Sequence, residues 1–266
     1  MCWISEEERA EMEKAEPHIV VQDLTVAYGS TVVLRDLTFT INRGDIFIIM
    51  GGSGGGKSTV LRSMVGLLQP TKGQVLYNGL NFWSAEPEEQ KSIMRKFGIL
   101  YQSGALWSSL TLAENIALPL QQYTNLSPGQ IKKIVSLKLA LVGLSGFEEY
   151  YPSEISGGMK KRAGLARAMA LDPDILFFDE PSAGLDPISA HLLDELIIEL
   201  RNSLGTTVVI VTHELASIFA IGNNSVFLDA DTKTMIAGGD PRKLLTESKD
   251  PRVINFLNRG EVMHKK

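Results

Sequence analysis

The nine residues GGSGGGKST at positions 51–59 constrain the fold of this chain more than any other segment, and they directly follow the apolar run IFIIM. They fit the pattern G-x-x-x-x-G-K-[ST], which forms a phosphate-binding loop where it connects a strand to a helix. Because glycine has no Cβ atom, successive backbone N–H groups in such a loop can point inward and bind an anion. The residues predicted to contact phosphate are Gly51, Gly52, Ser53, Gly54, Gly55, Gly56, Lys57, Ser58 and Thr59.

Two side chains of this segment add chemistry that a glycine-rich turn lacks. Lys57 supplies a full positive charge, and the hydroxyl of Ser58 is suited to bind Mg²⁺ beside a phosphate. Apolar residues then recur at three- and four-residue steps, which predicts a helix over residues 57–68. The N-terminal end of that helix carries a partial positive charge and would face the phosphates. The sequence therefore predicts a nucleotide-binding protein.

Length and charge narrow the classes of protein that are compatible with such a site. A chain of 266 residues can form one large α/β domain with an insertion, and it can bury a substantial core. The net charge of −5 argues against a broad nucleic-acid-binding face, so we expect no nucleic acid among the partners. No apolar run approaches the roughly eighteen residues that a membrane-spanning helix needs, which predicts a soluble, cytoplasmic protein.

The distribution of apolar runs predicts how the chain is organised. Strands are expected at residues 19–26, 32–41, 75–77, 175–178 and 207–211. Continuous apolar runs flanked by helical patterns are typical of a parallel sheet that is covered on both faces. Strand-like runs almost vanish between residues 87 and 170, where helical patterns take over, notably at 128–142 and after Ser156. This predicts a helical subdomain inserted into the nucleotide-binding core.

The two ends of the chain differ in character from the middle. We expect the charged residues 1–16 to be a flexible segment and residues 17–240 to form the main domain. Residues 241–266 are expected to form a C-terminal extension that docks on a neighbouring subunit. The apolar side chains expected to make this contact are Val253, Ile254, Phe256 and Leu257. The histidines His18, His191 and His264 fit no site and are expected at the surface.

A second signal for nucleotide chemistry is the segment ILFFDEP at residues 175–181, in which an apolar strand ends in two carboxylates. Acidic groups at a buried position need a charged partner or a metal ion. Asp179 would lie at the carboxyl end of a strand, where nucleotide sites form in open α/β sheets, and would hold Mg²⁺. Glu180 follows directly and is placed to polarise an attacking water.

A third signal is the segment EISGGMKKR at residues 154–162. Ser156 is expected to cap a helix, and Gly157 and Gly158 would let the backbone approach an anion closely. On its own, this segment is explained better by a helix cap without a ligand than by a binding site. Its value comes from its place in an ordered set of motifs.

That ordered set resembles the ATP-binding-cassette (ABC) ATPases over about residues 18–240. It comprises Tyr28, the phosphate loop, Gln102, ISGGM, ILFFDE, SAGLD at 182–186, and His213 after the last predicted strand. The resemblance implies an α/β fold with a RecA-like phosphate-loop NTPase core, an antiparallel β subdomain and the inserted helical subdomain. It also implies that two chains pair head to tail and sandwich two ATP molecules with Mg²⁺.

The resemblance assigns roles to the matched residues around one nucleotide. Tyr28 would stack on adenine, and Gln102 would contact Mg²⁺ and the attacking water. Glu180 matches the general base, and His213 matches the histidine that contacts the γ-phosphate. The residues implied as catalytic are Lys57, Gln102, Glu180 and His213, and those implied to bind the metal are Ser58, Gln102 and Asp179.

Other matched residues would act across the dimer. Ser156, Gly157 and Gly158 would contact the γ-phosphate that the other subunit holds, and Asp186 would let the two sites sense each other. The segment ISGGM at 155–159 corresponds to the signature motif of this family. Met159 departs from the commonest form of that motif, which has glutamine there. Because the implied phosphate contacts come from Ser156 and backbone amides, we expect activity to survive this difference.

A narrower resemblance concerns the transported molecule. The segment SGALWSSLTLAENIALPL at 103–120, the signature region and the tail DPRVINFLNRG at 250–260 look like the ATPases of Mla/Mce-type phospholipid transporters. The first segment is unusually apolar for an exposed stretch, which favours a partner surface. The resemblance implies a homodimer on the cytoplasmic side of the bacterial inner membrane, bound to two copies of a permease. It further implies a periplasmic Mce-type lipid-binding subunit and a small cytoplasmic accessory subunit.

Two other functions remain open from the sequence. One keeps the transport ATPase but replaces phospholipid with another small solute. The other is a soluble ABC ATPase that serves repair or cluster assembly. The acidic net charge, the single cassette and the apolar segment at 103–120 argue against this second alternative.

Overall fold

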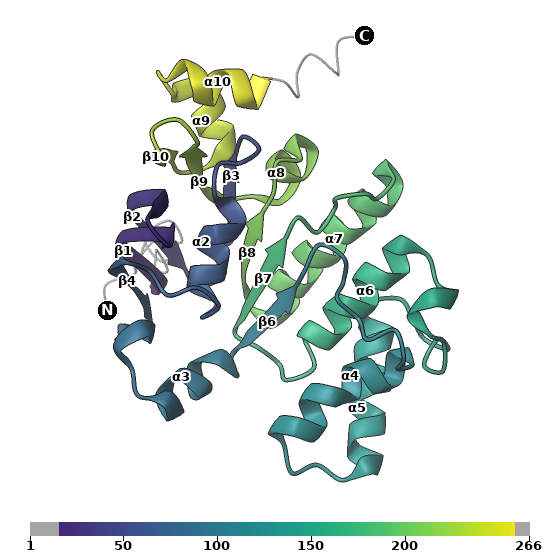
Figure 1. Cartoon of the computed structure of the whole chain (residues 1–266). Coiled ribbons are helices and arrows are strands. Elements are labelled where there is room, and N and C mark those ends of the chain that lie inside the picture. The colour runs from purple at the N-terminus through teal and green to yellow at the C-terminus, as the bar shows by residue number, and fades with distance from the viewer. Residues whose placement is uncertain (1–15, 259–266) are drawn as a thin grey trace, which may run out of the picture.

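The computed structural model describes residues 16–258, and its centre is a six-stranded sheet (Figure 1). In spatial order, the strands are β10 (Thr234–Gly238), β9 (Asn224–Asp229), β3 (Ile46–Gly51), β8 (Thr207–Val211), β7 (Ile175–Asp179) and β6 (Phe97–Leu100). Neighbouring strands from β9 to β6 run parallel, whereas β10 pairs antiparallel with β9 at one edge. The carboxyl ends of five strands therefore meet along the same edge of the sheet.

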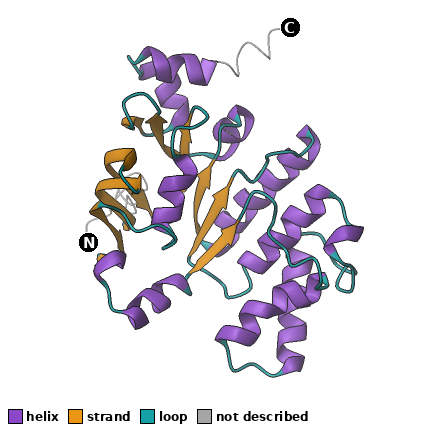
Figure 2. Ribbon diagram, in the orientation of Figure 1, coloured by secondary structure: helices purple, strands orange, loops and turns teal. Residues whose placement is uncertain are grey.

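A second, antiparallel sheet packs against one face of the first (Figure 2). Its strands, in spatial order, are β2 (Thr31–Asn42), β1 (Pro17–Tyr28), β4 (Lys72–Tyr77) and β5 (Leu80–Asn81). All five strands expected from the sequence are present in these two sheets. The predicted fold class, with a parallel core and an antiparallel β subdomain, is confirmed.

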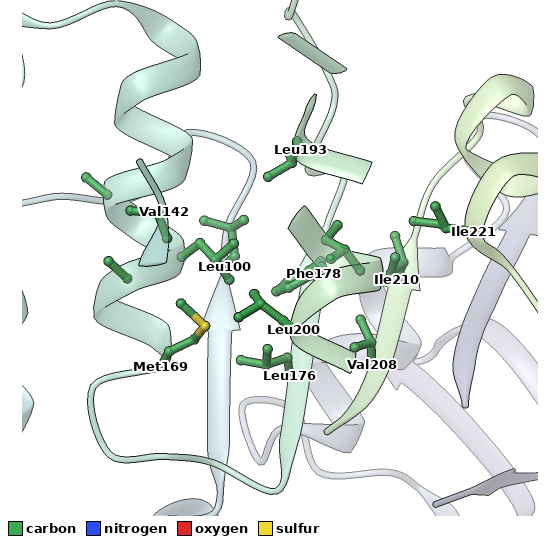
Figure 3. Packing of buried hydrophobic residues seen from close by; sticks show 14 of the residues in the cluster. Leu100, Val142, Met169, Leu176, Phe178, Leu193, Leu200, Val208, Ile210 and Ile221 are labelled. Carbon is green, nitrogen blue, oxygen red and sulfur yellow. The ribbon is translucent and has the colours of Figure 1, made fainter. Parts of the chain in front are cut away.

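The central strands are buried on both faces, so adjacent side chains enter different hydrophobic layers. Phe177 packs in the layer that contains α2 (Lys57–Met64) and the antiparallel sheet. Phe178 points into the other layer, formed with α6 (Gly157–Ala168) and α7 (Pro187–Leu204). Figure 3 shows Phe178 among Leu176, Ile210 and Leu200. The predicted coverage of both faces of the sheet is confirmed.

Helices α4 (Leu112–Tyr123) and α5 (Pro128–Leu141) pack with α6 to form the helical region. Both helices begin with a capping box, a pair of reciprocal hydrogen bonds that satisfies the free N–H groups of the first turn. In α4, Thr111 Oγ1 accepts from Glu114 N–H at 3.2 Å, and the Glu114 carboxylate accepts from Thr111 N–H at 2.8 Å. The remaining elements are η1 (Phe82–Ser84), α3 (Pro87–Met94), η2 (Pro152–Glu154), α8 (Leu215–Ile221), α9 (Pro241–Glu247) and α10 (Pro251–Asn258).

One strand was not expected, and one helix boundary is wrong. Strand β6 lies within residues 87–170, where we expected strand-like runs almost to vanish; its four residues are too few to stand out as an apolar run. Gly98 lets β6 approach α6, because a Cβ atom there would lie 2.3 Å from the carbonyl oxygen of Ala168. Helix α2 ends at Met64 rather than at residue 68, since Gly66 has a φ of 84°, outside the range of a right-handed helix.

The C-terminal helix α10 packs on its own chain (Figure 1). Val253, Phe256 and Leu257 are buried there, and the ring of Phe256 lies edge-on to that of Phe227 with centroids 5.1 Å apart. Arg252 Nη1 donates to Asp229 Oδ2 at 2.8 Å, which ties the helix to the end of β9. Three of the four apolar side chains expected to dock on a neighbouring subunit are therefore buried within their own chain, whereas Ile254 is only half-buried. A contact of the extension with a neighbouring subunit stays a prediction. Residues 259–266 lie outside the described part.

His18 is buried, although the sequence predicted that it would lie at the surface. It is 2% exposed, and its Nδ1 lies 2.7 Å from Thr207 Oγ1, at the junction of the two sheets. His191 is exposed as expected, whereas His264 and residues 1–15 of the predicted flexible segment at 1–16 lie outside the described residues. Within residues 16–258, no helix combines the length and the apolar character needed to cross a membrane.

Candidate nucleotide-binding site

The predicted phosphate loop begins at the carboxyl edge of the parallel sheet. β3 ends at Gly51, and residues 52–56 lead into α2. A Cβ atom at Gly51 would lie 2.2 Å from the carbonyl oxygen of Leu228, so no larger residue fits there. Gly56 precedes the helix with a φ of 77°, a left-handed conformation that glycine adopts without strain. The loop therefore needs glycine at both of its ends.

The side chain of Lys57 folds back over this loop. Its Nζ donates to the carbonyl oxygens of Gly51 and Gly52, each at 3.0 Å, and the residue is 8% exposed. Burial lowers the pKa of Lys57, while the negative charges of Glu180 and Asp179 act in the opposite direction. A buried ammonium held by loop carbonyls is well placed to exchange one of them for a phosphate oxygen.

Ser58 and Asp179 come together from two different elements. Ser58 stands in the first turn of α2 and Asp179 at the end of β7, yet Ser58 Oγ donates to Asp179 Oδ1 at 2.8 Å. Hydroxyl and carboxylate oxygens are the donors that a hard cation such as Mg²⁺ takes, with phosphate oxygens as further ligands. Two of the three residues that the sequence links to the metal, Ser58 and Asp179, therefore fit Mg²⁺ in their chemistry and in their closeness.

Glu180 is held in an unusual conformation beside this pair. Its φ of 50° is rare for a residue with a Cβ atom, and such strain is common at functional sites. Oε1 lies 2.8 Å from Nδ1 of His213, which comes from the segment after β8. Oε2 is buried and has no hydrogen-bond partner within residues 16–258. This carboxylate has one oxygen committed to the imidazole and one free to accept a proton.

Gln102 and Tyr28 lie at the margin of the site. Gln102 is exposed and follows β6 by two residues; the last residue of β6, Leu100, pairs with Phe178 one residue before Asp179. Tyr28 ends β1 with 48% of its surface exposed, and its hydroxyl accepts from Arg62 Nη1 at 3.2 Å. The exposed ring of Tyr28 is available for stacking.

The signature residues belong to another part of the molecule. Ser156 caps α6, its Oγ accepting from Met159 N–H at 3.2 Å. Helix α6 packs in the hydrophobic layer opposite to that of α2. A Cβ atom at Gly157 would meet nothing within 4 Å, and one at Gly158 would make only ordinary contacts with Ser189. The chain itself therefore gives no steric reason for glycine at these two positions.

Asp186 has a clear structural role within the chain. Its Oδ1 accepts from the backbone N–H groups of Ile188 and Ser189, at 3.1 and 3.0 Å, and so caps α7. The Ser189 hydroxyl donates to Oδ2 at 2.5 Å, and this hydrogen bond is the main reason that the pKa of Asp186 is lowered. Its carboxylate fixes the start of the helix that follows the loop after Glu180.

Two cations of α6 that were not predicted from the sequence contact the loops of the site. Lys161 Nζ lies 2.5 Å from the carbonyl oxygen of Pro181 and 2.6 Å from that of Ala183. Arg167 donates to the carbonyl oxygens of residues 104 and 105, just after the loop residue Gln102, at 3.2 and 2.7 Å. One pattern could have indicated that Lys161 is buried: it lies four residues before Leu165, on the same apolar face of the helix.

The structure thus brings the phosphate loop and the residues that follow β7 and β8 to one edge of the sheet. The residues that meet there are Gly51, Gly52, Lys57, Ser58, Asp179, Glu180 and His213. Gln102 and Tyr28 border this group, whereas the signature residues Ser156 to Gly158 start a helix of the other layer. One chain therefore carries a phosphate-binding face and, apart from it, a signature face.

Comparisons with known proteins identify this arrangement. A family model described as "ABC transporter" matches residues 34–183. The chain is 41% identical over 240 residues to the "Probable ribonucleotide transport ATP-binding protein mkl" of Mycobacterium tuberculosis, a match that covers 90% of this chain and 66% of that protein. It is 40% identical over 243 residues to the "Intermembrane phospholipid transport system ATP-binding protein MlaF" of Haemophilus influenzae, covering 91% and 90% of the two chains.

Solved structures agree with these relatives. The "Dimeric Structure of MJ0796, a Bacterial ABC Transporter Cassette" superposes with a TM-score of 0.76 at 29% identity, and covers 84% of this chain and 98% of that chain. The fold and the site define a phosphate-loop ATPase core. The chain belongs to the ABC transporter family and has the fold of its ATP-binding cassettes, as the sequence motifs predicted.

Proposed function

We propose that this chain is the ATP-hydrolysing subunit of a bacterial transporter that moves phospholipids between the inner and outer membranes. The observation that carries the catalytic part is the carboxylate of Glu180, with one oxygen on His213 and the other without a hydrogen-bond partner in the described part of the chain. The relative named for intermembrane phospholipid transport supports the cargo, because the match covers nine-tenths of both chains.

In this proposal, the chain's own residues position ATP and the attacking water. Lys57 and the loop amides bind the phosphates, and Tyr28 stacks on adenine. Glu180 accepts the proton of the water, while His213 orients that carboxylate and contacts the γ-phosphate. Ser58, Asp179 and Gln102 would hold Mg²⁺, whose positive charge would neutralise part of the phosphate charge.

The proposal also includes a head-to-tail homodimer. Ser156, Gly157 and Gly158 would contact the nucleotide bound to the partner, which gives glycine at these positions a reason that the single chain lacks. The solved cassette named as dimeric supports this pairing. Asp186, at the start of α7, would lie near the junction of the two sites.

A groove beside α4 provides the surface for a permease. Its volume is about 880 Å³, and its apolar lining includes the exposed side chains of Met94, Trp107 and Tyr123. Arg167 lines the same groove and donates to the carbonyl oxygens just after Gln102. A permease helix in this groove would therefore push on the segment that carries Gln102, which links its motion to ATP hydrolysis.

The remaining partners follow from the transport role. Two copies of the permease would bind the dimer, which would associate peripherally with the cytoplasmic face of the inner membrane. A periplasmic Mce-type subunit would bind the lipid, and a small cytoplasmic subunit would complete the complex. A second candidate cargo is a ribonucleotide, because the mycobacterial relative is named for that transport, although this chain spans only 66% of its length.

The test is a pull-down of the tagged chain from detergent-solubilised membranes, with mass spectrometry of proteins and of extracted lipid. A multi-span permease with bound phospholipid supports the proposal. A solute permease without lipid keeps the ATPase and replaces the cargo. Absence of any membrane partner contradicts transport and favours a soluble ATPase. The purified complex should then be reconstituted between two vesicle populations, with the Glu180→Gln variant as a control that cannot turn over ATP.

A further inference from the structure

We propose that Lys161 is a positioning residue for ATP hydrolysis, because its buried ammonium holds the backbone that immediately follows the catalytic carboxylate. This inference rests on the proposed function for its catalytic consequence. Its structural part, the fixing of residues 180–183 by Lys161, rests on the contacts of this chain alone.

The ammonium of Lys161 is almost completely enclosed. The residue is 5% exposed, and Nζ donates to the carbonyl oxygens of Pro181 and Ala183, with a longer approach of 3.5 Å to that of Glu180. Three N–H groups thus meet three backbone carbonyls. No carboxylate is hydrogen-bonded to Nζ within residues 16–258. Because an unpaired buried cation is costly, these carbonyls have to stay in place to compensate its desolvation.

Charge effects agree with this geometry. Burial lowers the pKa of Lys161, and the negative charge of Glu180 acts in the opposite direction. The carboxylate therefore favours the charged ammonium, while the ammonium places a positive charge next to the segment that carries the carboxylate. A neutral side chain of similar length would leave the carbonyl oxygens of Pro181 and Ala183 without this donor, whereas that of Glu180 would keep a hydrogen bond from Ala183 N–H at 3.2 Å.

The segment that Lys161 holds is one that needs support. Glu180 has a φ of 50°, and strained conformations of this kind persist only where the surroundings impose them. On the N-terminal side, Glu180 N–H donates to the carbonyl oxygen of Val211 at 2.8 Å, which anchors the residue to β8. On the C-terminal side, Ala183 N–H closes a local turn onto the Glu180 carbonyl oxygen at 3.2 Å, and Lys161 supplies the anchor that comes from a different layer of the molecule. The direction of the Glu180 side chain depends on both.

Helix α6 connects the Lys161 contact to the signature residues at its N-terminal end. The helix begins at the Ser156 cap, and Lys161 lies one and a half turns further along. The same rigid element therefore connects the signature, which is proposed to contact the ATP of the partner, with the base that acts on the chain's own ATP. A displacement of the signature would be passed to the Glu180 segment through the ammonium.

The test compares three variants of the full chain. Lys161→Met removes the charge and the donors but keeps the length, Lys161→Arg restores both, and Lys160→Met is the matched control. Lys160 is adjacent on α6, is half-buried, and makes no side-chain hydrogen bond within residues 16–258. We expect Lys161→Met to lower kcat by about tenfold or more, with the Kd for a fluorescent ATP analogue unchanged. Lys161→Arg should recover most of the rate, and Lys160→Met should match the wild type.

A second readout does not depend on catalysis. Hydrogen–deuterium exchange of peptides covering residues 180–186 should be faster in Lys161→Met than in Lys160→Met, while peptides of α2 exchange equally in both. If Lys161→Met does not fold, Lys161→Gln replaces it, with an expected loss of kcat of at least about threefold at unchanged ATP affinity.

Three results would overturn the inference: a folded variant with wild-type kcat, unchanged exchange at 180–186, or loss of ATP binding in step with kcat, which would show a merely structural role. Wild-type protein that does not hydrolyse ATP even with its membrane partner would contradict the proposed function instead. The exchange measurement still decides the structural part of the inference in that case.

Discussion

The imidazole of His213 and the carboxylate of Glu180 form a single hydrogen-bonded unit, with Nδ1 2.8 Å from Oε1. The two residues come from segments that follow neighbouring strands, β7 and β8, which pair in register up to Asp179 and Val211. The register of two buried strands therefore sets the distance between the proposed base and the histidine that orients it.

Glu180→Gln should abolish turnover while leaving ATP binding intact. The amide cannot accept the proton of the attacking water, whereas the loop and Lys57 that bind the phosphates are unchanged. We expect kcat to fall by about 100-fold or more, with ATP retained on the protein after gel filtration. A Gln variant that hydrolyses ATP at the wild-type rate would falsify the assignment of Glu180 as the base.

Met159→Gln should leave ATPase activity within about twofold of the wild type. The Met159 side chain packs against the helical layer, and its backbone N–H, which any residue supplies, donates to the cap Ser156. Steady-state ATP hydrolysis measures this, with Ser156→Ala as the comparison that removes the cap itself. A large gain in activity on restoring glutamine would mean that the methionine limits the natural protein.

His18→Gln should remove part of the pH dependence of stability. Burial, reinforced by the charge of Arg43, lowers the pKa of His18 from 6.5 to about 4. The unfolded chain then binds a proton that the folded chain does not, so the free energy of unfolding falls as the pH drops from about 6.5 to about 4, by about 3 kcal/mol in total. Urea unfolding across this range measures the loss in the wild type and its reduction in the variant.

The control for that measurement is His191→Gln, because His191 is exposed on α7. It should keep the pH dependence of the wild type. Equal slopes for the wild type and His18→Gln would show that His18 does not carry the effect.

Trp107→Ala should weaken the complex with the permease without changing ATP affinity. The indole is 62% exposed and lines the groove beside α4, away from the phosphate loop. Co-purification yield and ATPase stimulation by the permease are the measurements. Leu67→Ala, at a similarly exposed apolar residue that does not line the groove, is the matched control. Equal yields of co-purified permease for Trp107→Ala and Leu67→Ala would show that the permease does not dock in this groove.

Phe256→Ala should destabilise the chain by about 3 kcal/mol, because a buried aromatic side chain is lost from the layer that it shares with Phe227. Denaturant unfolding measures this, and Leu137→Ala, at an exposed position of α5, should have little effect. A neutral outcome for Phe256→Ala would mean that α10 is only loosely attached to its own chain.

The sequence predicts those parts of the site that consist of short, contiguous motifs. Residues 51–59 and the Asp179–Glu180 pair each lie at a strand end, so one run of residues contains both the fold signal and the chemistry. The role of Lys161 was not predicted, because it depends on the packing of α6 against a loop twenty residues further along the chain. The local spacing of apolar residues contains no information about that contact.

The other misses have similar physical causes. The apolar stripe of α10 predicted that Phe256 would be buried, but a stripe does not say against which surface, and the partner is β9 of the same chain. His18 lies in a strand at the junction of two sheets, where the approach of Thr207 decides its burial. Such junctions depend on tertiary packing rather than on residue type.

The adjacent residues Phe177 and Phe178 of β7 belong to two different hydrophobic layers. The same strands contribute to both layers, but each side chain packs in only one of them. A change of volume at Phe177 has to be absorbed by α2 and the antiparallel sheet, whereas one at Phe178 has to be absorbed by the helices that also carry the groove. A substitution in one layer is therefore compensated first within that layer. Over evolutionary time, the helices that carry the groove can adapt to a new membrane partner while α2 and its layer stay constant, provided that the contact of Lys161 with the Glu180 segment is kept.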